Sequence, residues 1–199
     1  MKHPISLAFA ALSLLTAHAT TATAGEYWSN DWWYVDDSSS DDGPTCGLTT
    51  KDEGTGGRSS VYTHILLNGN TDGVFVAVNN ADWTITKDRE YENLDITFFD
   101  ANGKMSAEYS GANWVGFGRD GLMSNNNKDI LEYFTKSHHA TIFRNDGTED
   151  EPEFTVIARV DLTGSAQAVS KLQECFARAQ TRHNANVARE RTNPRNPFG

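Results

Sequence analysis

The chain has 199 residues and a net charge of −10, with 27 acidic and 17 basic side chains. A hydrophobic content of 38% and an aromatic content of 11% are typical of a folded globular domain and argue against a disordered chain. The excess of acidic groups argues against nucleic acid as a partner, because contact with a phosphate backbone requires a basic surface.

Residues 1–24 have the pattern of a signal peptide. Lys2 precedes an apolar stretch over residues 5–15, and Ala22-Thr23-Ala24 provides a small-residue cleavage site. The apolar stretch is too short for a stable anchor, and no later one reaches the roughly 18–20 residues of a membrane span. We therefore expect a periplasmic or secreted protein without a transmembrane anchor.

The chain has two cysteines, Cys46 and Cys175. In an oxidising compartment an even number of well-separated cysteines favours a disulfide, and the alternative is two unpaired buried thiols. Because the chain has no Cys-x-x-Cys redox motif, we expect the bridge to be structural.

Strand signals follow one another from residue 27 to residue 162. Aromatic residues predict a first strand over residues 27–35, a turn-rich acidic segment follows, and a second strand starts at Cys46. Residues 61–67 and 74–78 read as a hairpin, because the Asn, Asp and Gly residues between them favour a turn. Further strands are predicted over four ranges: residues 94–98, 104–110, 140–144 and 154–162.

Two helices are predicted, a short one over residues 129–136 and a second one beginning near Ser165, whose hydroxyl can cap the following amides. Apolar residues recur at helical spacing on the second helix: Ala168, Val169, Leu172, Cys175, Phe176 and Ala179. Beyond Gln180 the periodicity fades. The predicted fold is a mainly β (α+β) domain over residues 25–180, an antiparallel sandwich or partly open barrel with the C-terminal helix packed on the sheet, and a basic flexible tail over 181–199.

Candidate metal ligands each have a structural alternative, and we expect no resident cofactor. Asn68, Asn70 and Asp72 match the first half of a calcium loop, but position 12 of that pattern is Asn79 and strands flank it, which favours a hairpin turn. Two other groups are the acidic cluster and the histidine pair: Asp36, Asp37, Asp41, Asp42, and His138 with His139. For the acidic cluster we favour a solvated loop, and for the histidine pair a strand whose neighbouring residues point to opposite faces.

No known catalytic motif is present, such as a nucleophile elbow, a zinc-protease helix or a phosphate-binding loop. Glu90, Glu92 and Asp95 are the carboxylates that an acid–base pair of a glycan hydrolase would draw on, and surface charge at a strand entrance is the alternative. The basic residues after Lys171 can contact an anionic surface, fold back on the acidic N-terminal segment, or remain solvated.

The aromatic cluster of the first strand is the predicted binding site. Trp28, Trp32 and Tyr34 can anchor a protein partner or stack on a sugar, since tryptophan and tyrosine are favoured in binding interfaces. In a strand, alternate residues face the core, so packing explains Trp33 and one side of the cluster.

The segment Val156-Ile-Ala-Arg-Val-Asp-Leu162, followed by Thr163-Gly164-Ser165 and the helix through Leu172, carries a resemblance to a family. In this strand–turn–helix the chain resembles the invasion-associated locus B proteins, which are small exported proteins of proteobacteria. The resemblance implies a β-rich envelope domain and assigns no catalytic residue. The chain departs from it in the long acidic interval between Trp33 and Cys46.

These observations favour an exported, non-enzymatic binding or interaction protein of the cell envelope. An envelope or extracellular protein is the expected partner, ahead of a glycan, and a basic surface would complement the net charge of −10. The alternatives are a glycan-directed hydrolase and a calcium-stabilised structural domain.

Overall fold

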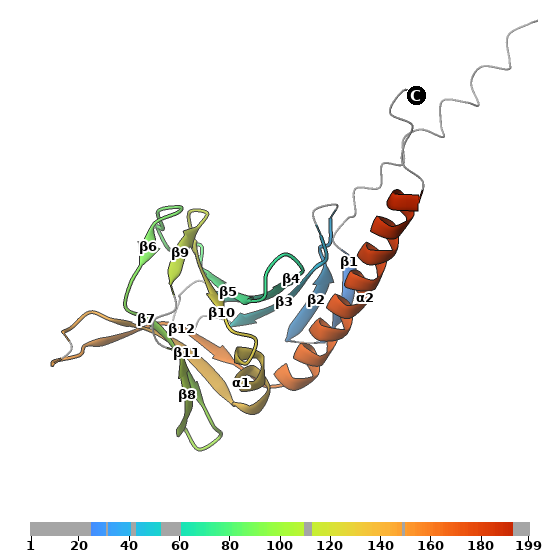
Figure 1. The fold of residues 1–199 in the computed structure, drawn as a ribbon. Coiled ribbons are helices and arrows are strands. Elements are labelled where there is room, and N and C mark those ends of the chain that lie inside the picture. The colour runs from blue at the N-terminus through green and yellow to red at the C-terminus, as the bar shows by residue number, and fades with distance from the viewer. Residues whose placement is uncertain are drawn as a thin grey trace, which may run out of the picture.

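The fold is described by a computed structural model, which covers residues 25–30, 32–40, 43–52, 61–109, 113–148 and 150–192 (Figure 1). The predicted signal peptide, Asp41 and Asp42 of the acidic cluster, and residues 193–199 of the predicted tail lie outside these ranges.

Two antiparallel sheets form the domain. The eight-stranded sheet, called the large sheet below, has the order β1-β2-β3-β4-β5-β10-β9-β6. Its strands are β1 (Gly25–Ser29), β2 (Trp33–Asp37), β3 (Thr45–Asp52), β4 (Val61–Asn68), β5 (Val74–Asn79), β6 (Glu90–Tyr91), β9 (Trp114–Phe117) and β10 (Gly121–Asn126). The four-stranded small sheet has the order β12-β11-β7-β8. Its strands are β7 (Leu94–Phe99), β8 (Met105–Tyr109), β11 (His139–Asn145) and β12 (Phe154–Asp161).

The alternation of residues along the strands separates the two faces of the large sheet. Val35 pairs with Leu48, Leu48 with Ile65 and Ile65 with Val76, so these side chains form one row across β2 to β5. Each of them is at most 1% exposed. This face packs against the small sheet, and the predicted antiparallel sandwich is confirmed.

The two helices close the core. In α1 (Ile130–Lys136) the side chains of Ile130 and Phe134 are buried. α2 (Ser165–Thr192) runs along β1 and β2 (Figure 1) and also contacts β3. The predicted apolar face of α2 packs as expected: Ala168, Val169, Leu172, Cys175 and Ala179 are buried. The short internal helix and the packed C-terminal helix are therefore both confirmed.

The Cys46–Cys175 disulfide joins β3 to α2, with Cα atoms 6.2 Å apart, as the sequence predicted. Two details of α2 differ from the prediction. The hydroxyl of Ser165 does not serve the amides that follow but donates a 2.5 Å hydrogen bond to the carbonyl oxygen of Phe134, which ties α2 to α1. The helix also continues past Gln180 to Thr192, so the first part of the predicted tail is helical.

In the described part of the chain, neither helix combines the length and the apolar character needed to cross a membrane.

Candidate functional site

The aromatic cluster at the N-terminus divides between the core and the surface. The indole of Trp33 is 1% exposed and donates a 2.8 Å hydrogen bond to the carbonyl oxygen of Thr163. Trp28 is partly buried and packs against the core, whereas Trp32 is 63% and Tyr34 37% exposed. The predicted binding residues Trp32 and Tyr34 are thus available to a partner, and Trp28 is available only in part.

The turn between β1 and β2 explains why Trp32 projects outward. The side-chain oxygen of Asn30 accepts hydrogen bonds from the backbone N–H groups of Trp32, at 2.9 Å, and Trp33, at 2.7 Å. This Asx turn fixes the backbone immediately before β2. The two neighbouring indoles are thereby sent in different directions, one into solvent and one into the core.

Tyr34 belongs to a face of the large sheet that we call the outer face. It pairs with Thr49, which pairs with His64, and the same row continues through Ala77 to Met123. Residues two positions away along each strand share this face. They include Asp36, Tyr62, Leu66, Phe75, Asn79 and Phe117.

The outer face is opposite the core. α2 and β12 contact the other side of the sheet, where Cys46 is bonded to Cys175. The large sheet is strongly curved, with β6 and β9 at one end and β1 and β2 at the other, and the outer face lies on the inside of this curve (Figure 1). Tyr62 is 38% and Phe117 54% exposed there. Within the described ranges, the outer face is therefore an uncovered, concave surface with exposed aromatic rings.

A fixed histidine lies near the middle of the outer face. Nδ1 of His64 is 2.9 Å from the hydroxyl of Thr49, and its Nε2 is 2.9 Å from the side-chain oxygen of Asn79. Contacts at both nitrogens hold the ring in one orientation. Sequence analysis did not identify His64, because its partners come from two other strands.

Asp36 lies on the same face beside Gly47. Burial raises the pKa of the Asp36 carboxyl, and the hydrogen bond from Ser38 and the charge of His64 offset part of this effect. A Cβ at position 47 would be 2.7 Å from Oδ1 of Asp36, so the carboxylate occupies space that only a glycine leaves open.

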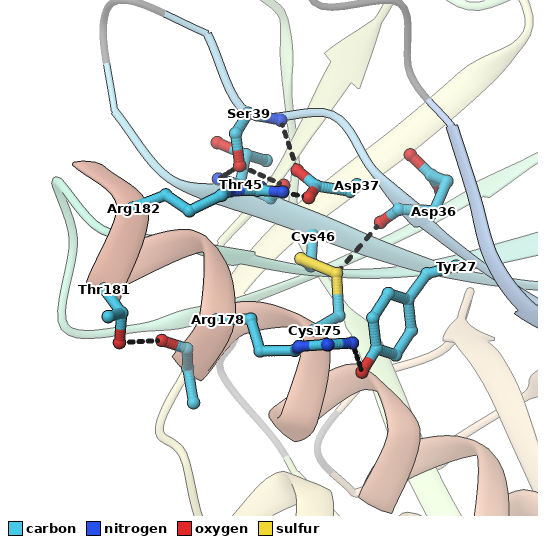
Figure 2. A network of polar contacts seen from close by, with 11 residues as sticks. Tyr27, Asp36, Asp37, Ser39, Thr45, Cys46, Cys175, Arg178, Thr181 and Arg182 are labelled. Carbon is cyan, nitrogen blue, oxygen red and sulfur yellow. Dashed lines mark hydrogen bonds and ion pairs between the residues drawn. A yellow bond between two sulfur atoms is a disulfide. The ribbon is translucent and has the colours of Figure 1, made fainter. Parts of the chain in front are cut away.

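A second polar region is the seam between α2 and the first strands (Figure 2). Arg182 forms an ion pair with Asp37, and the guanidinium of Arg178 donates a 3.2 Å hydrogen bond to the hydroxyl of Tyr27. Burial raises the pKa of Asp37, but hydrogen bonds from Ser39 and Arg182 outweigh it and hold this pKa below its usual value. Of the open possibilities for the basic C-terminal residues, Arg178 and Arg182 fold back on the N-terminal segment.

An open hollow of about 700 Å³ lies along the seam. Its lining residues are Tyr27, Asp37, Glu174, Ala177, Arg178, Thr181 and Arg182. Its charged groups are paired among themselves, since Lys171 also contacts Glu174 at 2.7 Å. The charged groups of the seam therefore serve to attach α2 to the large sheet.

Two groups of candidate metal ligands from the sequence lie around the connection between β4 and β5 and around the start of β11. Residues 69–73 connect β4 to β5, and the side-chain oxygen of Asn68, at the end of β4, accepts a 2.8 Å hydrogen bond from the backbone N–H of Asn70. His138 is exposed, and the ring of His139 stacks on Phe99 at 4.7 Å. In the ranges that the structure covers, no three His, Cys, Asp or Glu side chains are close enough together to hold a metal ion.

The three carboxylates considered from the sequence do not meet. Glu90 and Glu92 are exposed near the edge strand β6 of the large sheet, whereas Asp95 lies on β7 of the small sheet. Asp95 instead shares a hollow of about 190 Å³ with Thr97, Glu108, Phe143 and Phe154. The sequence could not indicate this group, because its members belong to four strands whose pairing is set by the tertiary fold.

Comparisons with known structures show a likeness in fold. No protein-family model matches the sequence, and no curated protein matches it either. The fold is similar to the crystal structure of invasion associated protein B from Bartonella henselae, at 12% identity and a TM-score of 0.49. The match covers 74% of this chain and 95% of that chain. That protein bears the name of the family that the C-terminal strand–turn–helix resembles, and the match assigns no function to this chain.

Proposed function

We propose that this chain is a non-enzymatic binding protein, exported to the periplasm or the extracellular space, that holds a protein partner on the outer face of its large sheet. The observation that carries the proposal is the uncovered concave face on which Tyr34, Tyr62 and Phe117 are exposed. The disulfide supports an oxidising compartment.

The composition of this face supports a protein ligand. Exposed aromatic rings supply apolar contact area with little loss of side-chain entropy, and tyrosine and tryptophan dominate binding hot spots. Trp32 extends the aromatic surface beyond the end of β2. His64, held by Thr49 and Asn79, adds an oriented polar group among these rings. The net charge of −10 favours a basic partner through electrostatic steering.

The test is crosslinked capture of partners from the native envelope, with wild-type protein and two variants. Deleting the first strands is unsuitable because Trp33 and Val35 are core residues. Trp32→Ala/Tyr34→Ala removes the exposed rings and leaves the core in place. Met105→Ala, at a residue that is 55% exposed on the small sheet, is the matched control.

We expect one stoichiometric partner whose affinity falls by about tenfold or more in the double variant, as for loss of a hot spot. The control should bind like the wild type, and all three proteins should have the same circular dichroism spectrum. Undiminished capture by the double variant would assign the partner to another surface. Absence of a protein partner would shift the search to glycans.

A further inference from the structure

The hollow on the small sheet brings two carboxylates together with two aromatic rings. It lies on the side of this sheet that faces away from the core, because Asp95 pairs with Phe143 while the neighbouring Ile96 and Ile142 are buried. Glu108 of β8 pairs with Thr97 of β7. Asp95 and Glu108 are therefore diagonal neighbours on adjacent strands, about 7–8 Å apart at their Cα atoms.

The polar groups of this hollow lack partners among the described residues. Asp95 and Glu108 form no ion pair or side-chain hydrogen bond there. Thr97 lines the hollow and is only 6% exposed, yet no described group hydrogen-bonds to its hydroxyl. The hydroxyl of Thr97 is therefore available to a ligand that enters the hollow.

The strands of the small sheet carry two arginines, and both contact groups outside the hollow. Arg144 forms an ion pair with Asp146 at 2.6 Å. Arg159, on the same side of the sheet as the hollow, lies 3.3 Å from Nε2 of His139. Asp95 and Glu108 are consequently paired with neither arginine, and their negative charge favours a cationic ligand.

The apolar wall specifies what kind of cation fits. The rings of Phe143 and Phe154 meet edge to face, with centroids 6.1 Å apart. Such rings attract a cation over their faces and cover the methylene groups that carry it. The volume of about 190 Å³ is below the roughly 300–1,000 Å³ of typical small-molecule sites, so one amino-acid side chain fills it.

We propose that this hollow binds the ammonium or guanidinium group of a Lys or Arg side chain from a basic segment of a protein partner. Asp95 and Glu108 hold the charge, Thr97 accepts a hydrogen bond from it, and the two phenylalanines contact its aliphatic stem. The site is on the other sheet from the outer face, and its test is independent of the proposed function.

The edge strand β12 favours a polypeptide over a free amine. β12 is the last strand of the small sheet, and Phe154 and Val156 on it are 60% and 54% exposed. An unpaired strand edge can take up an extended segment of another chain through backbone hydrogen bonds. A segment paired with β12 would run beside Phe154 and could place one of its side chains in the hollow. Three exposed carboxylates before β12 add to the attraction: Asp150, Glu151 and Glu153.

The experiment measures binding of a labelled lysine-containing pentapeptide by fluorescence anisotropy, with a norleucine peptide of the same length as the uncharged control. The variants are Asp95→Asn/Glu108→Gln, which removes the charge, and Phe154→Ala, which removes one wall. Glu92→Gln is the matched control at an exposed carboxylate outside the hollow. Thermal melting verifies that each variant is folded.

We expect saturable, salt-sensitive binding of the lysine peptide and none of the norleucine peptide. Affinity should fall by about tenfold or more in the double variant, fall in Phe154→Ala, and stay unchanged in Glu92→Gln. Equal affinities for both peptides, or an equal loss in Glu92→Gln, would refute the site. If free cadaverine competed with the same affinity as the lysine peptide, the ligand would be a free amine, and the assignment of the site to a polypeptide segment would be wrong. If the protein released reducing ends from a glycan and the double variant did not, Asp95 and Glu108 would instead be the acid–base pair of a hydrolase.

Discussion

Removing the disulfide tests how α2 is held on the large sheet. Cys46 and Cys175 are 0% and 1% exposed, so alanine at both positions keeps the apolar surroundings that serine would disturb. Reduction of the wild-type protein breaks the same bond while keeping both sulfur atoms. The two perturbations together separate the effect of the crosslink from that of the lost sulfur contacts.

The expected magnitude follows from the length of the closed loop. The two cysteines are 129 residues apart, and the chain-entropy relation gives about 5 kcal/mol for a loop of this size. Reduction should therefore lower the free energy of unfolding by about 4–5 kcal/mol, a large part of the roughly 5–15 kcal/mol of a typical domain. The Cys46→Ala/Cys175→Ala variant should lose this amount and slightly more, because the cavity left by the sulfur atoms adds to it.

Urea unfolding followed by tryptophan fluorescence measures both changes, with and without reductant. The dependence on urea should also steepen after reduction, because an unfolded chain without the crosslink exposes more surface. The reasoning fails if the reduced protein is within about 1 kcal/mol of the oxidised one at unchanged slope. In that case the packing of α2 would suffice to hold it.

Three further substitutions test single contacts by the same urea assay. Trp33→Phe should cost about 2–3 kcal/mol through the smaller ring and the unpaired carbonyl of Thr163, and a neutral result would contradict the 2.8 Å bond. Gly116→Ala should cost about 1–3 kcal/mol, since its Cβ would be 2.0 Å from the carbonyl oxygen of Thr86. Asp36→Asn should stabilise the protein near neutral pH and not in acid. Burial raises the pKa of this carboxyl in the folded protein, so its charged form opposes folding once the pH rises above the pKa that Asp36 has in the unfolded chain. Equal effects of the substitution at neutral and acidic pH would disprove this.

The elements with strong local patterns were predictable from the sequence. The hairpin of β4 and β5 has β-branched strands around a turn of Asn, Asp and Gly, and it forms as predicted. The buried face of α2 repeats at helical spacing from Ala168 to Ala179. In both cases neighbours in sequence carry enough information, because the contacts that decide the structure are local.

Elements that depend on distant partners were missed. β10 was not predicted as a strand, because Ser124 and Asn126 occupy its buried face, where the pattern calls for apolar residues. The end of α2 was predicted too early, since its last turns extend past the sheet and need no apolar side. The hollow at Asp95 and Glu108 depends on the pairing of β7 with β8, which one sequence does not specify.

The position of α2 has a consequence for the order in which the fold can be completed. The last described element closes the core over β2 and β3, which are among the first to be synthesised. A chain that emerges from its N-terminus therefore leaves the apolar faces of β2 and β3 unsealed until α2 follows, and contacts of such long sequence separation form slowly. Completion of this domain must wait for its final helix. Until then the chain stays in an unfolded state that can be translocated and that can also aggregate.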